Sequence, residues 1–275
     1  MEIFNAVLGK IFELLLLPFR NMNPWVGLAG ISLLTGFLML FIYRFTSNQS
    51  GIKKVKNKIK AHLLETRLYK DSLSLSLKAQ GNILLANLKY IGLNFRPLLV
   101  MIVPVLLILI QLNFWFGYEP LESGQPTLLK VKLEKGLNPL NADIALEPSP
   151  DIEMETAPLR IEEDSEINWR ISARTRGAHD VPIVIGGKKV AKTITADIKS
   201  LTRISPLRHN RSFLNNLLYP VEKPIQKDIP IESIEILYPA KRLNLFGLNI
   251  HWLIAYFMLS IVFGFAFKGV FKVEI

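Results

Sequence analysis

The chain has 275 residues, of which half are hydrophobic and only 20% are charged, against about 25% charged residues in an ordinary soluble domain. The apolar excess lies in three long uncharged stretches, which excludes a single large globular domain and indicates a membrane protein. The chain has no cysteine, so disulfides, thiolate metal sites and cysteine nucleophiles are excluded. The net charge is +10, and most of it comes from residues 44–96, where eleven basic and two acidic side chains give +9.

The three uncharged stretches have the length of membrane-spanning helices. They are residues 25–43, 97–118 and 243–267, with 19, 22 and 25 residues, and about 20 helical residues cross the hydrocarbon core of a bilayer. Aromatic residues, which favour the membrane–water interface, lie near their ends: Trp25, Tyr43, Trp115, Tyr118 and Trp252. The sequence therefore predicts three transmembrane helices.

The distribution of basic residues predicts the orientation of these helices. The positive-inside rule places loops rich in lysine and arginine in the cytoplasm. Residues 44–96 carry +9 and the tail, residues 268–275, carries +1, so we expect both in the cytoplasm. The N-terminus and residues 119–242 are then expected outside, in a multi-pass protein of a bacterial inner membrane.

Residues 1–24 are expected to form an amphipathic helix that lies in the outer membrane interface, with a poorly ordered tail as the alternative. The segment lacks the basic region that begins a cleaved signal peptide. Small or polar residues recur every three to four positions and would form one face of a helix, and apolar residues fill the rest of its surface. Pro18 ends the pattern. That face carries Glu2, Asn5, Gly9 and Glu13.

Residues 44–96 are expected to fold as a cytoplasmic helical hairpin. Two apolar stripes at helical spacing are separated by Lys70-Asp71-Ser72, which suits a turn. The stripes are Ile52, Val55, Ile59 and Leu63, and then Leu73, Leu77, Leu84, Leu88 and Ile91. We expect the two stripes to pair as a short antiparallel coiled coil.

The other face of the hairpin carries a cluster of lysines: Lys53, Lys54, Lys56, Lys58 and Lys60. One interpretation is that they control the topology and attract anionic lipid head groups, worth about 1 kcal/mol for each basic residue near the surface. The other is that they contact ribosomal RNA or an acidic nascent chain. We favour the first, because the cluster lacks interleaved aromatic residues and any base-reading motif, and we expect no DNA binding.

Residues 119–242 are long enough for one extracytoplasmic domain. Gly186-Gly187 predicts a two-residue β-hairpin turn. Trp169 lies within a predicted strand, as in many immunoglobulin-like sandwiches, although no cysteine pair accompanies it. The predicted strands are residues 128–133, 142–146, 152–161, 167–173, 181–185, 188–194 and 231–237.

The charge of this domain is polarised along the sequence. Residues 119–166 carry −8 and residues 167–247 carry +8. We expect strands of opposite charge to pair with each other; the alternative is that one charged face is a docking surface. Residues 203–227 are expected to form a partly helical connector near the membrane, with arginines in reach of lipid phosphates.

The sequence holds no convincing catalytic constellation. The four histidines lie in four different segments without metal-ligand spacing, and no phosphate-binding, dinucleotide-binding or nucleophile motif is present. We therefore expect no enzymatic activity, no metal and no cofactor. Four polar residues within the predicted spans are the candidates for an intramembrane groove: Ser32, Thr35, Gln111 and Ser260.

The first 118 residues resemble the YidC-type insertase superfamily, which includes archaeal homologues and a subunit of the endoplasmic-reticulum membrane complex. The likeness follows the order IFELLLLPF, GLAGISLLTGFLMLFIY, RFTSNQSGIKKVKNKIKA and NFRPLLVMIVPVLLILIQ. Bacterial members place an arginine in a hydrophilic groove of the first span, and the matching position here is Met39. The relatives also return to the membrane soon after the second span, whereas this chain inserts about 130 residues there.

The predicted fold is an α-helical membrane protein with three transmembrane helices plus an extracytoplasmic all-β, immunoglobulin-like sandwich domain. The expected function is that of a membrane-protein biogenesis factor, insertase-like or chaperone-like. Its partners would be the lipid bilayer, other membrane proteins as substrate chains or complex subunits, and the ribosome through the basic hairpin. The alternative is a scaffold subunit of a membrane or envelope complex that docks partners through the sandwich.

Overall fold

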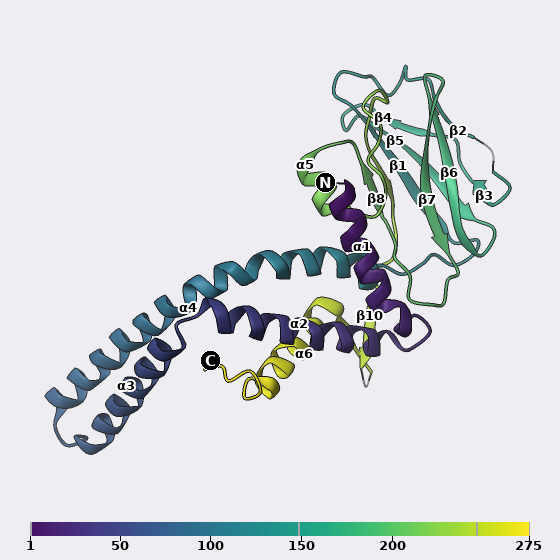
Figure 1. Ribbon diagram of the computed structural model, residues 1–275. Coiled ribbons are helices and arrows are strands. Elements are labelled where there is room, and N and C mark those ends of the chain that lie inside the picture. Colours follow the sequence, from purple (N-terminus) through teal and green to yellow (C-terminus); the bar gives the residue numbers. More distant parts are fainter. Residues whose placement is uncertain (1, 148, 246, 275) are drawn as a thin grey trace. The chain divides into compact units, whose positions relative to one another are not determined.

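The computed structural model describes residues 2–147, 149–245 and 247–274 (Figure 1). Met1, Pro148, Phe246 and Ile275 belong to predicted segments but lie outside the described residues. The chain divides into two compact units. The first consists of Met1–Gly27 and Leu109–Trp252, and the second of Leu28–Ile108 and Leu253–Ile275.

The first unit contains two main antiparallel β-sheets. The larger has the order β3-β5-β1-β9-β8, with β4 also paired to β5, and the smaller has the order β2-β6-β7. The strands of the larger sheet are β1 (Pro126–Leu133), β3 (Ile152–Met154), β4 (Leu159–Ile161), β5 (Glu166–Ala173), β8 (Leu207–His209) and β9 (Ile231–Ile236). Those of the smaller sheet are β2 (Ile144–Leu146), β6 (Gly177–Ile185) and β7 (Lys188–Ala196).

The apolar alternation in the sequence explains why these strands pack around one core. Leu129, Val131 and Leu133 of β1 are fully buried, and the lysines between them point away. Trp169 is 1% exposed and belongs to a cluster with residues of both sheets. The predicted strands are confirmed, except that residues 152–161 form two short strands, and β8 was not predicted. The immunoglobulin-like arrangement stays a prediction.

The predicted hairpin at Gly186-Gly187 is confirmed. Ile185 pairs with Lys188 across the turn, and both glycines have positive φ angles of 54° and 77°. A two-residue turn of this kind needs the left-handed region at both positions, which glycine enters without steric cost.

Ion pairs join the acidic part of the domain, residues 119–166, to its basic part, residues 167–247. Ion pairs join Glu153 to Arg174 at 3.2 Å and Glu155 to Arg170 at 2.9 Å, and Glu147 contacts a lysine of β7. Because these side chains are partly exposed, each pair contributes at most about 1 kcal/mol. These pairs therefore add little to the stability of the domain.

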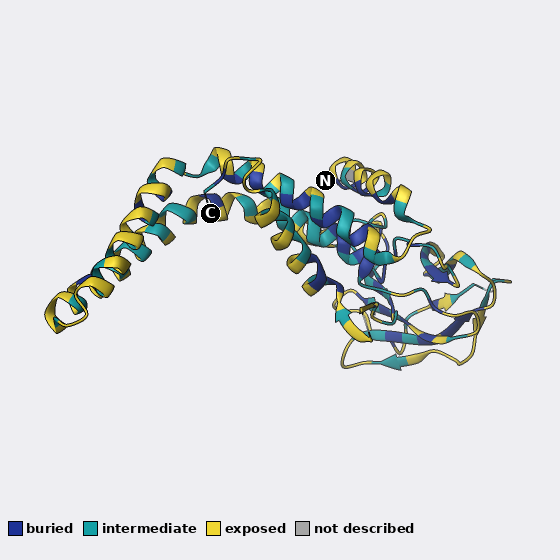
Figure 2. Ribbon diagram, turned by 90° about the horizontal axis from the view of Figure 1, so that it is seen from below, coloured by how far each residue is buried: buried dark blue, intermediate teal, exposed yellow. Residues whose placement is uncertain are grey.

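The N-terminal segment is helical, as predicted. Helix α1 (Glu2–Leu16) leads into a 3₁₀ turn, η1 (Leu17–Phe19), which contains Pro18. One face of α1 is buried in the first unit: Asn5, Gly9, Phe12 and Leu16. The opposite, apolar face is exposed (Figure 2), with exposed fractions of 82% at Ile3 and 69% at Leu14.

The structure differs from the predicted third span at its beginning. Residues 242–251 form a β-hairpin of β10 (Arg242–Leu245) and β11 (Leu248–His251), and the helix α6 covers only Trp252–Phe267. The Asn244 side chain accepts a hydrogen bond from the Gly247 backbone at 3.1 Å, and Gly247 has a φ of 86°. This turn chemistry ends any helix before Trp252.

Among the described residues, two helices are long and apolar enough to cross a membrane: α2 (Pro24–Thr46) and α4 (Leu73–Phe116). Helix α4 has 44 residues and continues through Pro97 and Pro104, so it is about 66 Å long at 1.5 Å per residue. The predicted hairpin and the second span therefore share one continuous helix. Each internal proline removes one backbone hydrogen bond, which the rest of so long a helix tolerates.

Helix α3 (Gln49–Leu68) and the first part of α4 form the predicted hairpin, with a turn at residues 69–72 (Figure 1). The predicted pairing of the two apolar stripes is wrong. Ala79 of α4 is buried, whereas the stripe on the opposite face of α4 is exposed, from 57% to 77%. The leucine stripe of α4 is therefore not covered by α3. The exposed stripe consists of Leu73, Leu77, Leu84, Leu88 and Ile91.

The C-terminal tail packs against the beginning of the hairpin within the second unit. Val273 joins a buried cluster with Leu40 and Ile52. The Glu274 backbone N–H donates to the Gln49 side chain at 2.7 Å, and Lys56 Nζ lies 3.2 Å from the Glu274 carboxylate. The two segments that were predicted to share the cytoplasmic side therefore lie together.

Candidate functional site

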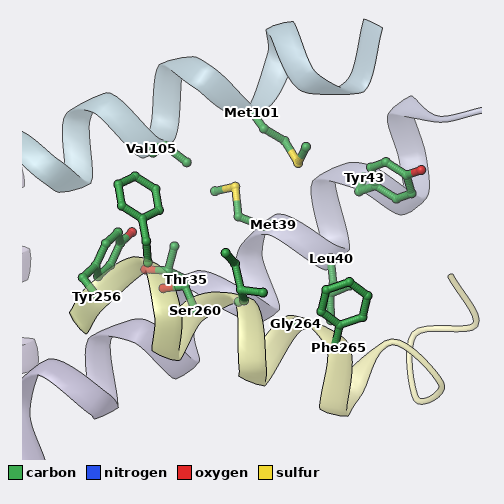
Figure 3. A pocket seen from close by; sticks show the side chains of 13 residues that line it. Thr35, Met39, Leu40, Tyr43, Met101, Val105, Tyr256, Ser260, Gly264 and Phe265 are labelled. Atoms are coloured by element: carbon green, nitrogen blue, oxygen red, sulfur yellow. The ribbon is translucent and has the colours of Figure 1, made fainter. Parts of the chain in front are cut away.

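A cavity of about 300 Å³ lies between α2, α4 and α6 in the second unit (Figure 3). Most of its lining is apolar, including two methionines, Met39 and Met101, that approach each other from α2 and α4. The full lining is Thr35, Gly36, Met39, Leu40, Tyr43, Met101, Val105, Tyr256, Phe257, Ser260, Ile261, Gly264 and Phe265.

A close approach of α2 and α6 sets the width of this cavity. A Cβ atom at Gly36 would lie 3.4 Å from the backbone nitrogen of Gly264 and from the carbonyl oxygen of Ser260. Small residues at such a crossing let helix backbones come together. Phe37 and Phe267 add an edge-to-face contact with ring centroids 4.8 Å apart. The two helices are thus fixed against each other beside the cavity.

Three hydroxyl groups gather at one end of the cavity, on Thr35, Tyr256 and Ser260 (Figure 3). Thr35 Oγ1 donates to the carbonyl of Ile31 at 2.8 Å. The Tyr256 hydroxyl and Ser260 Oγ are buried, and neither has a hydrogen-bond partner among the described residues. A buried polar group without a partner costs about 1–3 kcal/mol. This end of the cavity is therefore suited to a polar group brought by a ligand or by water.

The structure places the four predicted groove residues in two environments. Thr35 and Ser260 line the cavity, and Ser32 is buried beside it, 3.5 Å from the Tyr256 carbonyl oxygen. Gln111 belongs to the first unit, where its Oε1 accepts a hydrogen bond from Arg203 Nη2 at 3.0 Å. It lies five residues before the end of α4, so an arginine from the following domain can reach it.

Sequence reasoning did not assign Met39, Tyr43 or Tyr256 to the groove. Helical spacing is a signal that could have found them. Met39 and Tyr43 follow Thr35 at steps of four, and Tyr256 precedes Ser260 by four. Residues four apart lie on one face of a helix, so the face that carries one candidate carries its neighbours too.

The predicted basic surface lies on α3. Lys53, Lys54, Lys58 and Lys60 are exposed, so they are accessible to an anionic surface. Lys56 is only half-buried and pairs with Glu274 of the tail. The exposed stripe of leucines lies on the neighbouring helix of the same hairpin.

Buried polar contacts hold residues 203–224 against the β-sheets of the first unit. Lys192 is fully buried, donates to the Ser205 carbonyl at 2.6 Å and pairs with Glu222. Burial lowers the pKa of Lys192, and the carboxylate of Glu222 partly offsets this. Arg208 Nε also donates to the Lys223 carbonyl at 2.8 Å. Residues 203–224 of the predicted connector are thus held in place, and we call them the pinned segment; they include α5 (Phe213–Leu218).

Comparisons of the chain with models of known protein families, with curated proteins and with solved structures find no match. The resemblance of residues 1–118 to YidC-type insertases therefore rests on the order and polarity of their segments. Within residues 2–147, 149–245 and 247–274, no group of three histidine, aspartate or glutamate side chains lies close enough together to hold a metal ion.

Proposed function

We propose that this protein is a non-enzymatic membrane-protein biogenesis factor, insertase-like or chaperone-like, and a distant relative of the YidC-type insertases. In this proposal α2, α4 and α6 cross a bacterial inner membrane, and the β-sheets form an immunoglobulin-like sandwich outside. The observation that carries the proposal is the cavity between the three apolar helices, with unpartnered hydroxyls at one end.

The cavity would shelter part of a client segment while that segment enters the bilayer. Methionine side chains are flexible and fill irregular space, so Met39 and Met101 would adapt to different apolar side chains. Tyr256 and Ser260 would offer hydrogen bonds to a polar group of the client, which otherwise costs several kcal/mol to place in hydrocarbon.

The residue at position 39 is a departure from the insertases. This residue stands where the resemblance places the arginine of bacterial members, and it lines the cavity. Because the cavity lining carries neutral hydroxyls and no charged side chain among the described residues, its clients would carry uncharged polar groups.

The short third helix suggests how the protein would act on the bilayer. Helix α6 has 16 residues and is about 24 Å long, whereas the hydrocarbon core is about 30 Å thick. A span shorter than the core thins the bilayer locally. The thinning would lower the barrier for the hydrophilic part of a client, and the amphipathic α1 would act in the same direction from the outer interface.

The cytoplasmic hairpin would meet the client first. Its exposed leucines on α4 and its exposed lysines on α3 offer an apolar surface beside a basic one. Apolar surface of this kind marks an interaction site. A nascent chain, a ribosome and anionic lipids each match part of that surface.

The alternative, a scaffold subunit that docks partners through the sandwich, is favoured by one observation. The cavity is lined mainly by apolar side chains, as a packing seam between helices would be. A scaffold would hold one fixed partner and would not depend on protein synthesis.

Photocross-linking distinguishes the two functions. A photoreactive residue is placed at Met39, in the cavity, and as a control at Phe41, whose side chain is 53% exposed on another face of α2. A biogenesis factor gives adducts to nascent membrane proteins from position 39 and not from position 41, and Thr35→Leu with Ser260→Leu reduces them. A single partner that persists when synthesis is stopped would overturn the proposal and identify a scaffold subunit.

A further inference from the structure

A second cavity, of about 400 Å³, lies in the first unit between α1 and the pinned segment. Its lining includes Ile3 and Asn5 of α1, Asn216 of α5, Arg203 and Lys223. The Asn5 side chain donates to the Asn216 carbonyl, which ties α1 to α5 at this cavity. The cavity is separate from the one between the apolar helices, and nothing proposed above uses it.

Arg203 is the unusual residue of this cavity. Its Nη2 donates to Gln111, and its Nη1 lies against Gly9, where a Cβ atom would come within 2.7 Å of it. Its Nε is buried without a hydrogen-bond partner, and the ion pairs of the described residues do not include Arg203. Burial lowers the pKa of Arg203, and Glu13 offsets this only in part. Arginine nevertheless stays charged in proteins.

A bound anion would stabilise the positive charge of Arg203. Burying a cation without a partner is costly, and a counter-charge with hydrogen bonds removes much of that cost. Glu222 also lines the cavity, but its carboxylate is engaged by Lys192. Lys223 adds a second, exposed cation to the lining. The site therefore favours an anion with several acceptor oxygens, and a phosphate matches a guanidinium especially well.

The surroundings of the cavity identify the kind of phosphate. Ile3 lines the cavity and is 82% exposed, and on α5 the side chains of Phe213 and Leu214 are 66% and 63% exposed. Apolar residues therefore lie on both helices that border a cationic cavity. A ligand that matches both features has a phosphate and long apolar chains.

We propose that this cavity binds the phosphate of a phospholipid, with Arg203 as its counter-ion and Lys223 as a second contact. The acyl chains lie along the exposed apolar faces of α1 and α5. The site ties the first unit to one leaflet of the bilayer, independently of the biogenesis function. Free phosphate shares the headgroup chemistry, so the experiment separates the two sources.

The test uses the purified full chain, delipidated in a non-ionic detergent. Its thermal unfolding midpoint is followed by tryptophan fluorescence while dioleoylphosphatidylglycerol, dioleoylglycerol or inorganic phosphate is added. At a hundredfold excess over the dissociation constant the phospholipid raises the midpoint by about 5 °C. Dioleoylglycerol, which lacks the phosphate, and inorganic phosphate, which lacks the chains, leave it within about 1 °C.

Variants assign the effect to the cavity. Arg203→Gln raises the half-saturating phospholipid concentration at least tenfold. Lys223→Gln raises it about threefold, and because Lys223 is exposed this substitution leaves the fold intact. Arg176→Gln, at an exposed arginine of the β5–β6 turn, leaves it unchanged. The proposal is overturned if dioleoylglycerol or inorganic phosphate alone reproduces the shift, or if both cavity variants respond as the unaltered protein does.

Discussion

The ion pair between Lys192 and Glu222 allows the most direct test of the packing of the first unit. Lys192 is fully buried in β7, whereas Glu222 belongs to the pinned segment, which includes α5. Glu222→Gln removes the carboxylate and leaves the ammonium group with the Ser205 carbonyl as its remaining partner. The substitution preserves the shape of the side chain, so its effect reports on charge.

The expected loss is about 3–5 kcal/mol, the cost of leaving one member of a buried ion pair uncompensated. With a urea dependence of about 1–3 kcal/mol per molar, the unfolding midpoint falls by about 1 M or more. The double change Lys192→Met with Glu222→Leu replaces the pair by apolar groups and stays within about 2 kcal/mol of the unaltered protein. Lys189→Met, in the same strand, breaks an exposed pair with Glu147 and costs at most about 1 kcal/mol.

The pH dependence of the Glu222→Gln variant has a definite sign. Burial lowers the pKa of Lys192 in the folded protein, while in the unfolded chain it returns to about 10.4. Between these two values the unfolded chain binds more protons, so stability rises with pH. The rise is larger in the variant, because the carboxylate that raises this pKa is gone.

Pulse proteolysis of the full chain in urea, at pH 7 and pH 9, measures both effects on the β-sheets. A loss below about 1 kcal/mol for Glu222→Gln at pH 7 would refute the assignment of a buried, charged pair. So would a variant whose stability falls as the pH rises between these two values.

The remaining predictions concern the core, the cavity and the hairpin. Trp169→Ala removes a side chain at the centre of the shared core and should cost the β-sheets about 3–5 kcal/mol, measured by the same proteolysis. Tyr256→Phe removes a hydroxyl without a partner among the described residues. The free energy of unfolding of the full chain should therefore stay unchanged or rise by up to about 1 kcal/mol, measured by thermal unfolding. Leu84→Gln and Leu88→Gln alter exposed side chains and should each change stability by less than about 0.5 kcal/mol, while cross-links from the hairpin to its clients are lost.

The β-sheets were largely predictable because residues close together in the sequence determine where each strand lies and which of its faces is buried. Alternation buries Leu129, Val131 and Leu133, and a strand has only two faces to choose from. Gly186-Gly187 fixes the β6–β7 register at a single turn. Even Lys192 obeys this rule, since it shares a face with Val190 and Ile194. The alternation places the lysine inside, but it cannot supply Glu222, which is 30 residues away.

The helical regions were less predictable, because an apolar segment does not say what covers it. The stripe on α4 has the spacing of a packed seam, yet its leucines are exposed, whereas Ala79 on the opposite face of α4 is buried. The sequence 243–251 is apolar on average, which concealed the turn at Asn244 and Gly247. Hydropathy averages over a window, whereas the turn depends on two particular residues.

The hydrogen bond between Gln111 and Arg203 changes what the proposed groove can do. A glutamine among Thr35 and Ser260 would offer both a donor and an acceptor to a client, but the Gln111 oxygen is engaged by Arg203. The polar side chains that line the cavity carry hydroxyls alone. Hydroxyls do not titrate near neutral pH, so the cavity would act on its clients equally at every physiological pH. The cations without an ion pair among the described residues, Arg203 and Lys223, line the other cavity, in the first unit, where a lipid phosphate and not a client would compensate them.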